Sequence, residues 1–338
     1  MMFVEDLHSA LVPYLSGEVY VVTDERAAEY CLPLLGTTGV PTLVLPCGEQ
    51  NKNIVSVEKI WDFLLQHHAT RRAVVLNIGG GVVTDMGGFA AATYKRGVRF
   101  VNIPTTLLAM VDASTGGKTG INYGGIKNAI GTFSAPEDTL LYMPFLETLP
   151  AQEWLSGFAE MLKHALLQDK KMWNALLTYD IDRRPITPIR TILADSLHVK
   201  QDIVAQDPHE QGLRKALNFG HTVGHAIEEM YAQQGLPVPH GYCVLWGMVA
   251  ELYLSVALLA FPREPLTQMV DLMLHYYGRP QCNCKQQEQL LTLMQQDKKN
   301  THAGVVSFTL LKDIGIPVLD QTPSEDLIKE ALDYLFSL

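Results

Sequence analysis

The stretch Asn77-Ile78-Gly79-Gly80-Gly81-Val82-Val83-Thr84-Asp85 connects an apolar run, expected to form a buried strand, to a segment expected to begin a helix. Three successive glycines let backbone N–H groups approach a phosphate closely, and the dipole of the following helix favours negative charge. The stretch therefore predicts a cradle for a dinucleotide or another phosphate. Its spacing differs from Gly-x-Gly-x-x-Gly, however, and glycine triplets also form ordinary tight turns, so both interpretations stay open. Asp85 suits either a helix cap or a ligand contact.

The sequence on both sides of this stretch alternates short apolar runs with helical segments. Apolar runs predict strands at residues 19–22, 42–45, 73–78 and 100–103. Residues 54–67 instead carry apolar side chains at helical spacing. Such alternation implies βα units on a largely parallel sheet. We therefore expect an α/β domain over residues 1–150.

After residue 150 the strand signals thin out and long amphipathic segments dominate. These segments predict helices at residues 154–167, 187–204, 220–231 and 244–259. We therefore expect an all-helical second domain over residues 151–338. Residues 234–241 contain proline and glycine and are expected to form an ordered loop between two of these helices.

The composition narrows the class of protein. A chain of 338 residues, 47% hydrophobic and 18% charged, is long enough for two folded domains. Its net charge of −10 argues against a surface for nucleic acid or an anionic membrane, so an anionic ligand must be met by local cations. The five cysteines are irregularly spaced, and the sequence contains neither a signal-peptide pattern nor eighteen consecutive apolar residues. We expect a cytoplasmic protein.

A second glycine-rich stretch runs from Asp112 to Asn128. Its Gly117-Lys118-Thr119 is similar to the end of a P-loop, but Asp112 stands where that motif requires glycine, which disfavours ATP hydrolysis. A lysine in a glycine-rich loop still suits an anion. The stretch continues with Lys127 and with the side-chain amides of Asn122 and Asn128. We expect the whole stretch to be an anion-binding loop.

The second half contains a candidate metal site. Glu160 and Lys163 are three residues apart, and the small and apolar residues around them predict partial burial rather than a surface ion pair. His221 and His225 are four apart on one helical face, and His240 follows. Two histidines with Glu160 would make a zinc site of catalytic composition. Spacing leaves open which two histidines bind, and any one of them alone suits an ordinary helix histidine.

Charged residues gather next to these candidate ligands. Lys200, Glu210, Arg214 and Asn218 lead into the histidine helix, and Asp297-Lys298-Lys299-Asn300 follows later. A single lysine or arginine on a helix is usually solvated surface. Their concentration beside a candidate metal site indicates a charged ligand.

Together these segments resemble the 3-dehydroquinate synthase family of sugar phosphate cyclases, in the same order from about Glu49 to Lys299. Further matching stretches are residues 94–98, 104–108 and 156–163. The resemblance implies a Rossmann-like domain that binds NAD over residues 1–150, and a helical domain that binds zinc over residues 151–338. It also implies a homodimer, and cobalt as a possible substitute for zinc.

The resemblance further implies roles for individual residues. It assigns zinc binding to Glu160, His221 and His240, and it assigns His225 to substrate binding instead. The residues implied for NAD are Asp24, Glu49, Lys52, Gly80, Gly81, Val82, Asp85, Thr105, Thr106, Leu108, Lys127, Thr148 and Glu153. The residues implied for substrate and catalysis are Asp112, Lys118, Asn128, Lys163, Lys200, Glu210, Arg214, Asn218, His225 and Lys298, with Lys299 competing for the last role. Arg96 is expected to reach the phosphate across a dimer interface.

The implied reaction converts 3-deoxy-D-arabino-heptulosonate 7-phosphate to 3-dehydroquinate and phosphate, a step of the shikimate pathway to aromatic amino acids. NAD is reduced and reoxidised within one turnover, phosphate is eliminated, and an intramolecular aldol closes the ring. The alternatives are another sugar phosphate cyclase, a metal-dependent polyol dehydrogenase, or a catalytically silent binding protein of the same fold.

One position departs from the family pattern: Tyr242 follows His240-Gly241 where many members carry an acidic residue. This change leaves the partner that orients His240 undetermined.

Overall fold

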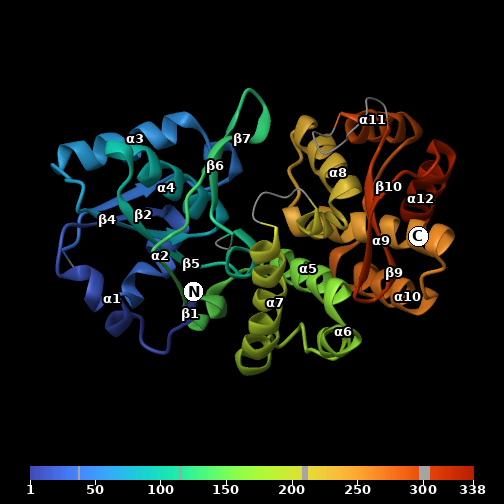
Figure 1. Cartoon of the computed structure of the whole chain (residues 1–338), viewed down its shortest axis with the longest axis horizontal. Coiled ribbons are helices and arrows are strands. Elements are labelled where there is room, and N and C mark those ends of the chain that lie inside the picture. Colours follow the sequence, from blue (N-terminus) through green and yellow to red (C-terminus); the bar gives the residue numbers. More distant parts are fainter. Residues whose placement is uncertain (37–38, 114–115, 208–211, 297–304) are drawn as a thin grey trace. The chain divides into compact units, whose positions relative to one another are not determined.

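The computed structural model describes residues 1–36, 39–113, 116–207, 212–296 and 305–338. The chain divides into two compact units, Met1–Pro150 and Ala151–Leu338 (Figure 1). Each unit has its own buried apolar core.

The first unit is built on a parallel sheet, as the alternating pattern predicts. Among the described residues its strand order is β1-β8-β5-β4-β2-β3, and every neighbouring pair is parallel. The strands are β1 (Met2–Phe3), β2 (Val19–Asp24), β3 (Thr42–Leu45), β4 (Val74–Gly79), β5 (Arg99–Pro104) and β8 (Asp138–Leu141). The four strands predicted from apolar runs are confirmed as β2 to β5, whereas the short β1 and β8 were not predicted.

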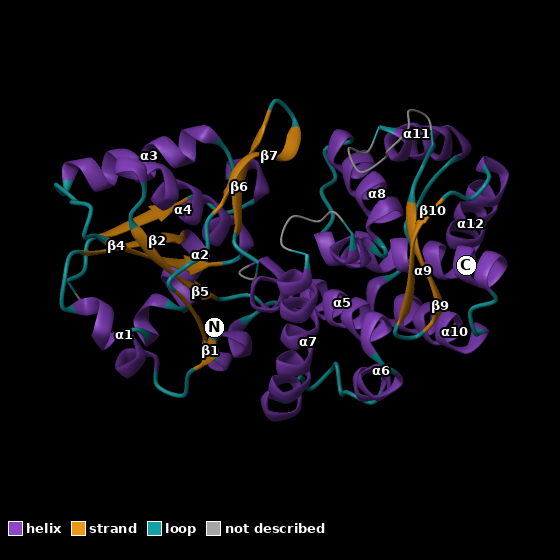
Figure 2. Cartoon of the chain, in the orientation of Figure 1, coloured by secondary structure: helices purple, strands orange, loops and turns teal. Residues whose placement is uncertain are grey.

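Helices cover this sheet (Figure 2). They are α1 (Leu7–Leu15), α2 (Glu25–Tyr30), α3 (Ile54–Gln66) and α4 (Gly81–Thr93), with short turns η1 (Leu32–Leu34), η2 (Glu49–Asn51), η3 (Tyr94–Arg96), η4 (Ala109–Ala113) and η5 (Met143–Thr148). Apolar side chains of α3 and α4, including Val57, Ile60 and Val83, form one core with Val75 of β4. This packing fixes the start of α4 directly after β4, so the predicted passage from strand to helix at the glycine triplet is confirmed.

The stretch expected to be an anion-binding loop is instead largely an antiparallel hairpin of β6 (Lys118–Tyr123) and β7 (Ile126–Phe133). Figure 1 shows it extending away from the parallel sheet. Gly124 and Gly125 make its turn with φ of 59° and 80°. A Cβ on Gly131 would lie 2.2 Å from the Thr119 carbonyl oxygen. Glycine therefore serves the turn and the close approach of the strands, which is why the loop expectation was wrong.

The second unit is mainly helical. Its helices are α5 (Ala151–Gln168), α6 (Lys170–Leu177), α7 (Ile186–Gln206), α8 (His221–Gln233), α9 (His240–Leu259), α10 (Arg263–Leu272), α11 (Cys284–Gln295) and α12 (Glu325–Ser337), with short turns η6 (Leu213–Asn218) and η7 (Met273–Tyr277). The expectation of an all-helical domain is wrong in one respect, because β9 (Phe308–Asp313) and β10 (Ile316–Gln321) form an antiparallel pair. The apolar residues of β9 are only Phe308, Leu310 and Leu311, and so short an apolar run cannot be distinguished from a buried helix segment by periodicity alone.

Helix α9 is the central helix of the second unit. It packs against α5, α8, α12 and β9. Among the described residues it is the one helix long and apolar enough to cross a membrane, but 67% of that window is buried inside the protein. Its apolar character is therefore explained by its position in a core.

Candidate functional site

Helices α8 and α9 approach each other closely through glycines. A Cβ on Gly247 of α9 would lie 2.0 Å from the carbonyl oxygen of Gly220, which caps α8. A Cβ on Gly224 would lie 2.8 Å from the Cys243 carbonyl oxygen, and one on Gly241 would lie 2.0 Å from the Ser156 carbonyl oxygen of α5. No side chain fits at these points, so three helices meet backbone to backbone.

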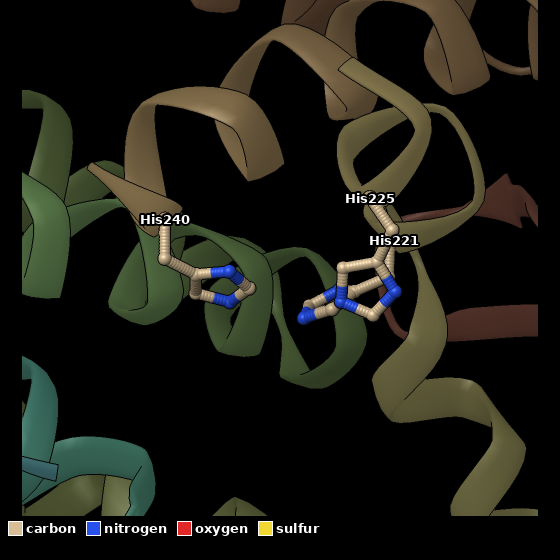
Figure 3. A group of neighbouring side chains, drawn as sticks. All are labelled: His221, His225 and His240. Carbon is tan, nitrogen blue, oxygen red and sulfur yellow. The ribbon is translucent and has the colours of Figure 1, made fainter. Parts of the chain in front are cut away.

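This approach brings three histidines together, as Figure 3 shows. His221 and His225 extend from α8 toward His240, which is the first residue of α9. One ring nitrogen from each histidine lies within 4.8 Å of the others. The ring centroids of His221 and His240 are 5.4 Å apart, and those of His225 and His240 are 5.8 Å apart. The three candidate ligands predicted from spacing therefore form a single cluster.

Glu160 lies beside this cluster and is completely buried. Its Oε1 is 3.5 Å from His221 Nε2 and 3.6 Å from His240 Nε2, and Lys163 forms an ion pair with Oε2. Burial alone would raise the pKa of Glu160, but Lys163, His221 and His240 outweigh it and hold the pKa well below its usual range. The predicted burial of Glu160 and Lys163 is confirmed and is more complete than expected.

The donor set of this site fits a zinc ion. Glu160 Oε1 is buried and accepts no hydrogen bond, although a buried carboxylate oxygen normally has a partner. Imidazole nitrogens together with one carboxylate oxygen are typical ligands of catalytic zinc. A cation among these atoms would satisfy the orphaned oxygen and use the ring nitrogens that face it.

In His221 and His240, the second ring nitrogen, Nδ1, also has a partner. His221 Nδ1 lies 3.1 Å from the Phe219 carbonyl oxygen, and His240 Nδ1 lies 3.2 Å from Glu228 Oε2. A carbonyl or carboxylate oxygen accepts a hydrogen bond from Nδ1–H, which holds the proton on Nδ1 and directs Nε2 to a metal. Burial lowers the pKa of His240, but Glu228 and Glu160 outweigh it and raise the pKa to about 10. A metal that binds Nε2 therefore displaces the proton that this nitrogen carries in the metal-free protein.

Glu251 fixes the start of the histidine helix, a role that the sequence analysis missed. This fully buried side chain of α9 accepts hydrogen bonds from the N–H groups of Gly220 at 2.6 Å, Thr222 at 3.1 Å and Val223 at 3.2 Å. A carboxylate at a helix N-terminus satisfies unpaired donors and complements the dipole. The available signal was one acidic residue within the apolar run of residues 244–259.

The other predicted site residues of the second unit lie on three elements. Lys200 on α7 and Arg214 on η6 are buried, with 6% and 4% of their surfaces exposed. Asn218 ends η6, which packs against both α5 and α7, and Glu153 lies in the first turn of α5. The predictions for Glu210, Lys298 and Lys299 fall outside the described residues.

In the first unit, several residues predicted for NAD lie at the carboxyl edge of the sheet. Asp24 ends β2, the glycine triplet runs from the last residue of β4 to the first residue of α4, and Thr105 and Thr106 follow β5. The Thr105 N–H donates to the Gly79 carbonyl at 3.0 Å, and a Cβ on Gly80 would lie 3.4 Å from Thr106 Cγ2. Ligands of parallel sheets bind at this edge.

A hydrogen-bonded network joins further predicted residues of this unit. Lys52 Nζ donates to Asp85 Oδ2 and to Asn128 Oδ1, both at 2.6 Å. Asn122 Nδ2 donates to Glu49 Oε1 at 2.8 Å, and the Asn128 N–H donates to Asn122 Oδ1 at 2.8 Å. Burial raises the pKa of Asp85 despite the opposing charge of Lys52. Lys52, which the resemblance implies for NAD, therefore contacts Asn128 of the hairpin, which the resemblance implies for the substrate.

The remaining predicted residues of the first unit range from half-buried to exposed. Arg96 lies in an exposed turn with φ of 70°, a left-handed conformation uncommon for residues with a Cβ. Leu108 follows β5, and Asp112 lies on η4. Lys118 and Lys127 are on the hairpin, Thr148 ends η5, and Val82 is in the first turn of α4.

Comparisons with known proteins cover most of the chain. Residues 42–156 match the family model described as 3-dehydroquinate synthase N-terminal, and residues 157–300 match 3-dehydroquinate synthase C-terminal. The 3-dehydroquinate synthase of Parabacteroides distasonis is 42% identical over 338 residues, covering 98% of this chain and 96% of the relative.

Solved structures of two synthases are also similar. The 2-epi-5-epi-valiolone synthase of Streptomyces hygroscopicus subsp. jinggangensis 5008, solved with NAD+ and Zn2+ bound, is 26% identical with a TM-score of 0.87, over 99% of this chain and 96% of that one. A 2-deoxy-scyllo-inosose synthase, complexed with carbaglucose-6-phosphate, NAD+ and Co2+, is 21% identical with a TM-score of 0.81, over 98% of this chain and 95% of that one. At 21% identity the second likeness concerns the fold alone.

Proposed function

The chain belongs to the 3-dehydroquinate synthase family and is an enzyme with that activity, and we propose that Glu160, His221 and His240 hold its catalytic zinc ion. The observation that carries this proposal is the buried Glu160 oxygen, which accepts no hydrogen bond and lies 3.5 and 3.6 Å from the Nε2 atoms of the two histidines. Cobalt suits the same nitrogen and oxygen donors.

The first unit binds NAD in this proposal. Gly80, Gly81 and Val82 offer backbone N–H groups at the start of α4, and Asp24, Thr105, Thr106 and Leu108 line the same edge of the sheet. Glu49, Lys52 and Asp85 belong to the hydrogen-bonded network at the hairpin, and Lys127 lies on β7. Thr148 of the first unit and Glu153 on α5 of the second unit complete the set. When bound, zinc supplies Lewis acidity toward substrate hydroxyls and NAD supplies a reversible hydride acceptor.

The substrate proposed is 3-deoxy-D-arabino-heptulosonate 7-phosphate, which carries a carboxylate and a phosphate. The buried cations Lys163, Lys200 and Arg214 suit these groups, because a positive charge in a site that excludes water attracts a carboxylate or phosphate strongly. The guanidinium of Arg214 matches a carboxylate or phosphate with two parallel hydrogen bonds. Asn218 and His225 would orient the sugar ring, while the lysines and His225 stabilise negative charge that develops on it.

The remaining proposed contacts come from the first unit and from the segments outside the described residues. They are Asp112, Lys118, Asn128, Glu210 and Lys298 or Lys299. Arg96 is proposed to reach the phosphate of the substrate that is bound to a partner subunit, which requires a homodimer. The proposed location is the cytoplasm.

Phosphate release from this substrate is the test of the proposal. Purified protein supplied with NAD and zinc is expected to release many phosphates per NAD without accumulating NADH, and a chelator is expected to stop the release. Net NADH formation would instead favour a polyol dehydrogenase. Absence of phosphate release from this substrate, with release from a sugar phosphate that lacks a carboxylate, would favour another cyclase.

A matched pair of variants tests the division among the histidines. His221→Ala is expected to lose both zinc and activity, because it removes a ligand. His225→Ala, one turn along the same helix, is expected to lose activity while its zinc content stays at one ion per chain. Loss of zinc from the second variant alone would reverse the assignment.

A further inference from the structure

The ring of His240 is held by a side chain from another helix. His240 begins α9, while Glu228 lies on α8, and Glu228 Oε2 lies 3.2 Å from His240 Nδ1. The two side chains are 27% and 11% exposed, so the pair is largely shielded from solvent. The opposite nitrogen, Nε2, faces Glu160 Oε1 at 3.6 Å. The imidazole therefore lies between two carboxylates.

The residue that follows His240-Gly241 does not provide this contact. The ring of Tyr242 packs against Tyr277, with centroids 4.8 Å apart, and against Trp246, with centroids 6.3 Å apart. Tyr277 in turn donates its hydroxyl to the Leu155 carbonyl at 2.8 Å. Tyr242 thus belongs to an aromatic group between α9, η7 and α5, and the carboxylate that contacts His240 comes from α8.

The spacing on α8 explains how one helix can do this. His221, His225 and Glu228 stand at positions i, i+4 and i+7 of α8, and residues at this spacing share one helical face. Glycine contacts hold that face close to the start of α9. The same face therefore carries a proposed zinc ligand, a proposed substrate contact and the partner of a second ligand.

We propose that Glu228 is the positioning residue of His240: by accepting a hydrogen bond from Nδ1–H it fixes the tautomer and the ring orientation that direct Nε2 to zinc. This inference rests on the proposed zinc site. A carboxylate behind a ligating histidine orients the ring and makes it a stronger donor, and loss of such a partner lowers metal affinity about 10- to 100-fold. Glu228 touches neither the metal nor the reacting atoms in this role.

Zinc affinity, measured by competition with a chromophoric chelator, tests the inference on the full chain. Glu228→Ala is expected to bind zinc at least about tenfold more weakly, and Glu228→Gln to fall between it and the unchanged protein, because the amide oxygen still accepts a hydrogen bond without the charge. The matched control is Glu229→Gln, since Glu229 is the adjacent residue and accepts from Gln233 Nε2 at 2.9 Å within its own helix. This control is expected to keep its zinc affinity.

A spectroscopic readout separates positioning from a general loss of structure. In cobalt-substituted protein, Glu228→Gln is expected to change the visible absorption bands, which report ligand geometry, whereas Glu229→Gln is not. If Glu228→Ala does not fold, Glu228→Gln carries the test, and unchanged zinc affinity together with unchanged cobalt bands in that variant overturns the inference. His221→Ala separates failure of the zinc site from failure of the positioning role. If His221→Ala keeps its zinc affinity, the zinc site itself is refuted. If His221→Ala loses zinc affinity while Glu228→Gln has no effect, only the positioning role is refuted.

Discussion

Glu251 shows what a single buried charge contributes to the site. Its carboxylate lies in the apolar helix α9 and accepts three backbone N–H groups at the start of α8, from Gly220, Thr222 and Val223. The backbone of Glu251 is linked to β9 through Ser255. Ser255 Oγ donates a hydrogen bond to the Glu251 carbonyl and accepts one from the Leu311 N–H of β9. The residue thus joins the histidine helix, the central helix and the small sheet.

Replacement of Glu251 by alanine is expected to destabilise the second unit strongly. Each buried N–H left without an acceptor costs about 1–3 kcal/mol, so the free energy of unfolding should fall by at least about 3 kcal/mol. Glu251→Gln should lose less, because one acceptor oxygen remains. Denaturant unfolding followed by circular dichroism measures both, with Glu288→Ala on the exposed face of α11 as the control. Equal stability of Glu251→Ala and that control would contradict the capping role.

At the level of elements, glycines decide how close α8 and α9 lie. Gly220 and Gly224 on one side and Gly247 on the other remove the side chains that would keep the helix backbones apart. Packed helices usually lie 8–10 Å apart, depending on the side chains at the contact, and small residues allow the shorter separations. The histidine cluster depends on this separation, because His221 and His225 are on α8 and His240 is on α9.

Gly247→Ala tests this dependence. Its methyl group would lie 2.0 Å from the Gly220 carbonyl oxygen and 2.7 Å from the Gly224 nitrogen, so the helices must separate. Overpacking of this kind costs about 3 kcal/mol. We expect a lower free energy of unfolding together with weaker zinc binding, measured by denaturant titration and chelator competition. Gly17→Ala, where a Cβ meets nothing within 4 Å, is the control. Weakened stability with unchanged zinc affinity would separate the helix contact from the metal site.

At the level of the whole molecule, the chain assigns its two proposed cofactors to different units. The buried carboxylate and the histidine cluster belong to Ala151–Leu338, while the glycine triplet and the Lys52 network belong to Met1–Pro150. A ligand stabilises the unit that binds it, by about 2.7 kcal/mol when its concentration is one hundred times its dissociation constant. Zinc and NAD should therefore protect different parts of the chain.

Hydrogen exchange measured by mass spectrometry can resolve this difference. Zinc added to chelator-treated protein is expected to slow exchange in α5, α8 and α9, and NAD alone is expected to slow it in α4 and the β6–β7 hairpin. The reverse pattern, or protection of the first unit by zinc alone, would contradict the assignment. Chelator-treated protein at the same pH without additions is the reference state.

The sequence by itself determined the features that depend on neighbours along the chain. Apolar runs and helical periodicity predicted β2 to β5 and the helices α3, α5, α7, α8 and α9 within a few residues, because burial of one face imposes a regular spacing. The passage from β4 through the glycine triplet into α4, and the shared face of His221 and His225, have the same local origin. The order of the motifs identified the family.

Tertiary structure decided the features that join distant residues. The Glu251 contact with Gly220 spans 31 positions, and the Lys52 contact with Asn128 spans 76, so no local spacing encodes them. The apolar runs of β1, β8 and β9 are too short to be recognised as strands by periodicity. The glycines of the β6–β7 hairpin match a loop pattern in the sequence, although they serve a close backbone approach. Likewise the residue that holds His240 is Glu228 on a neighbouring helix rather than Tyr242 beside it, because a side chain finds its partners in space and only packing sets which partners are near.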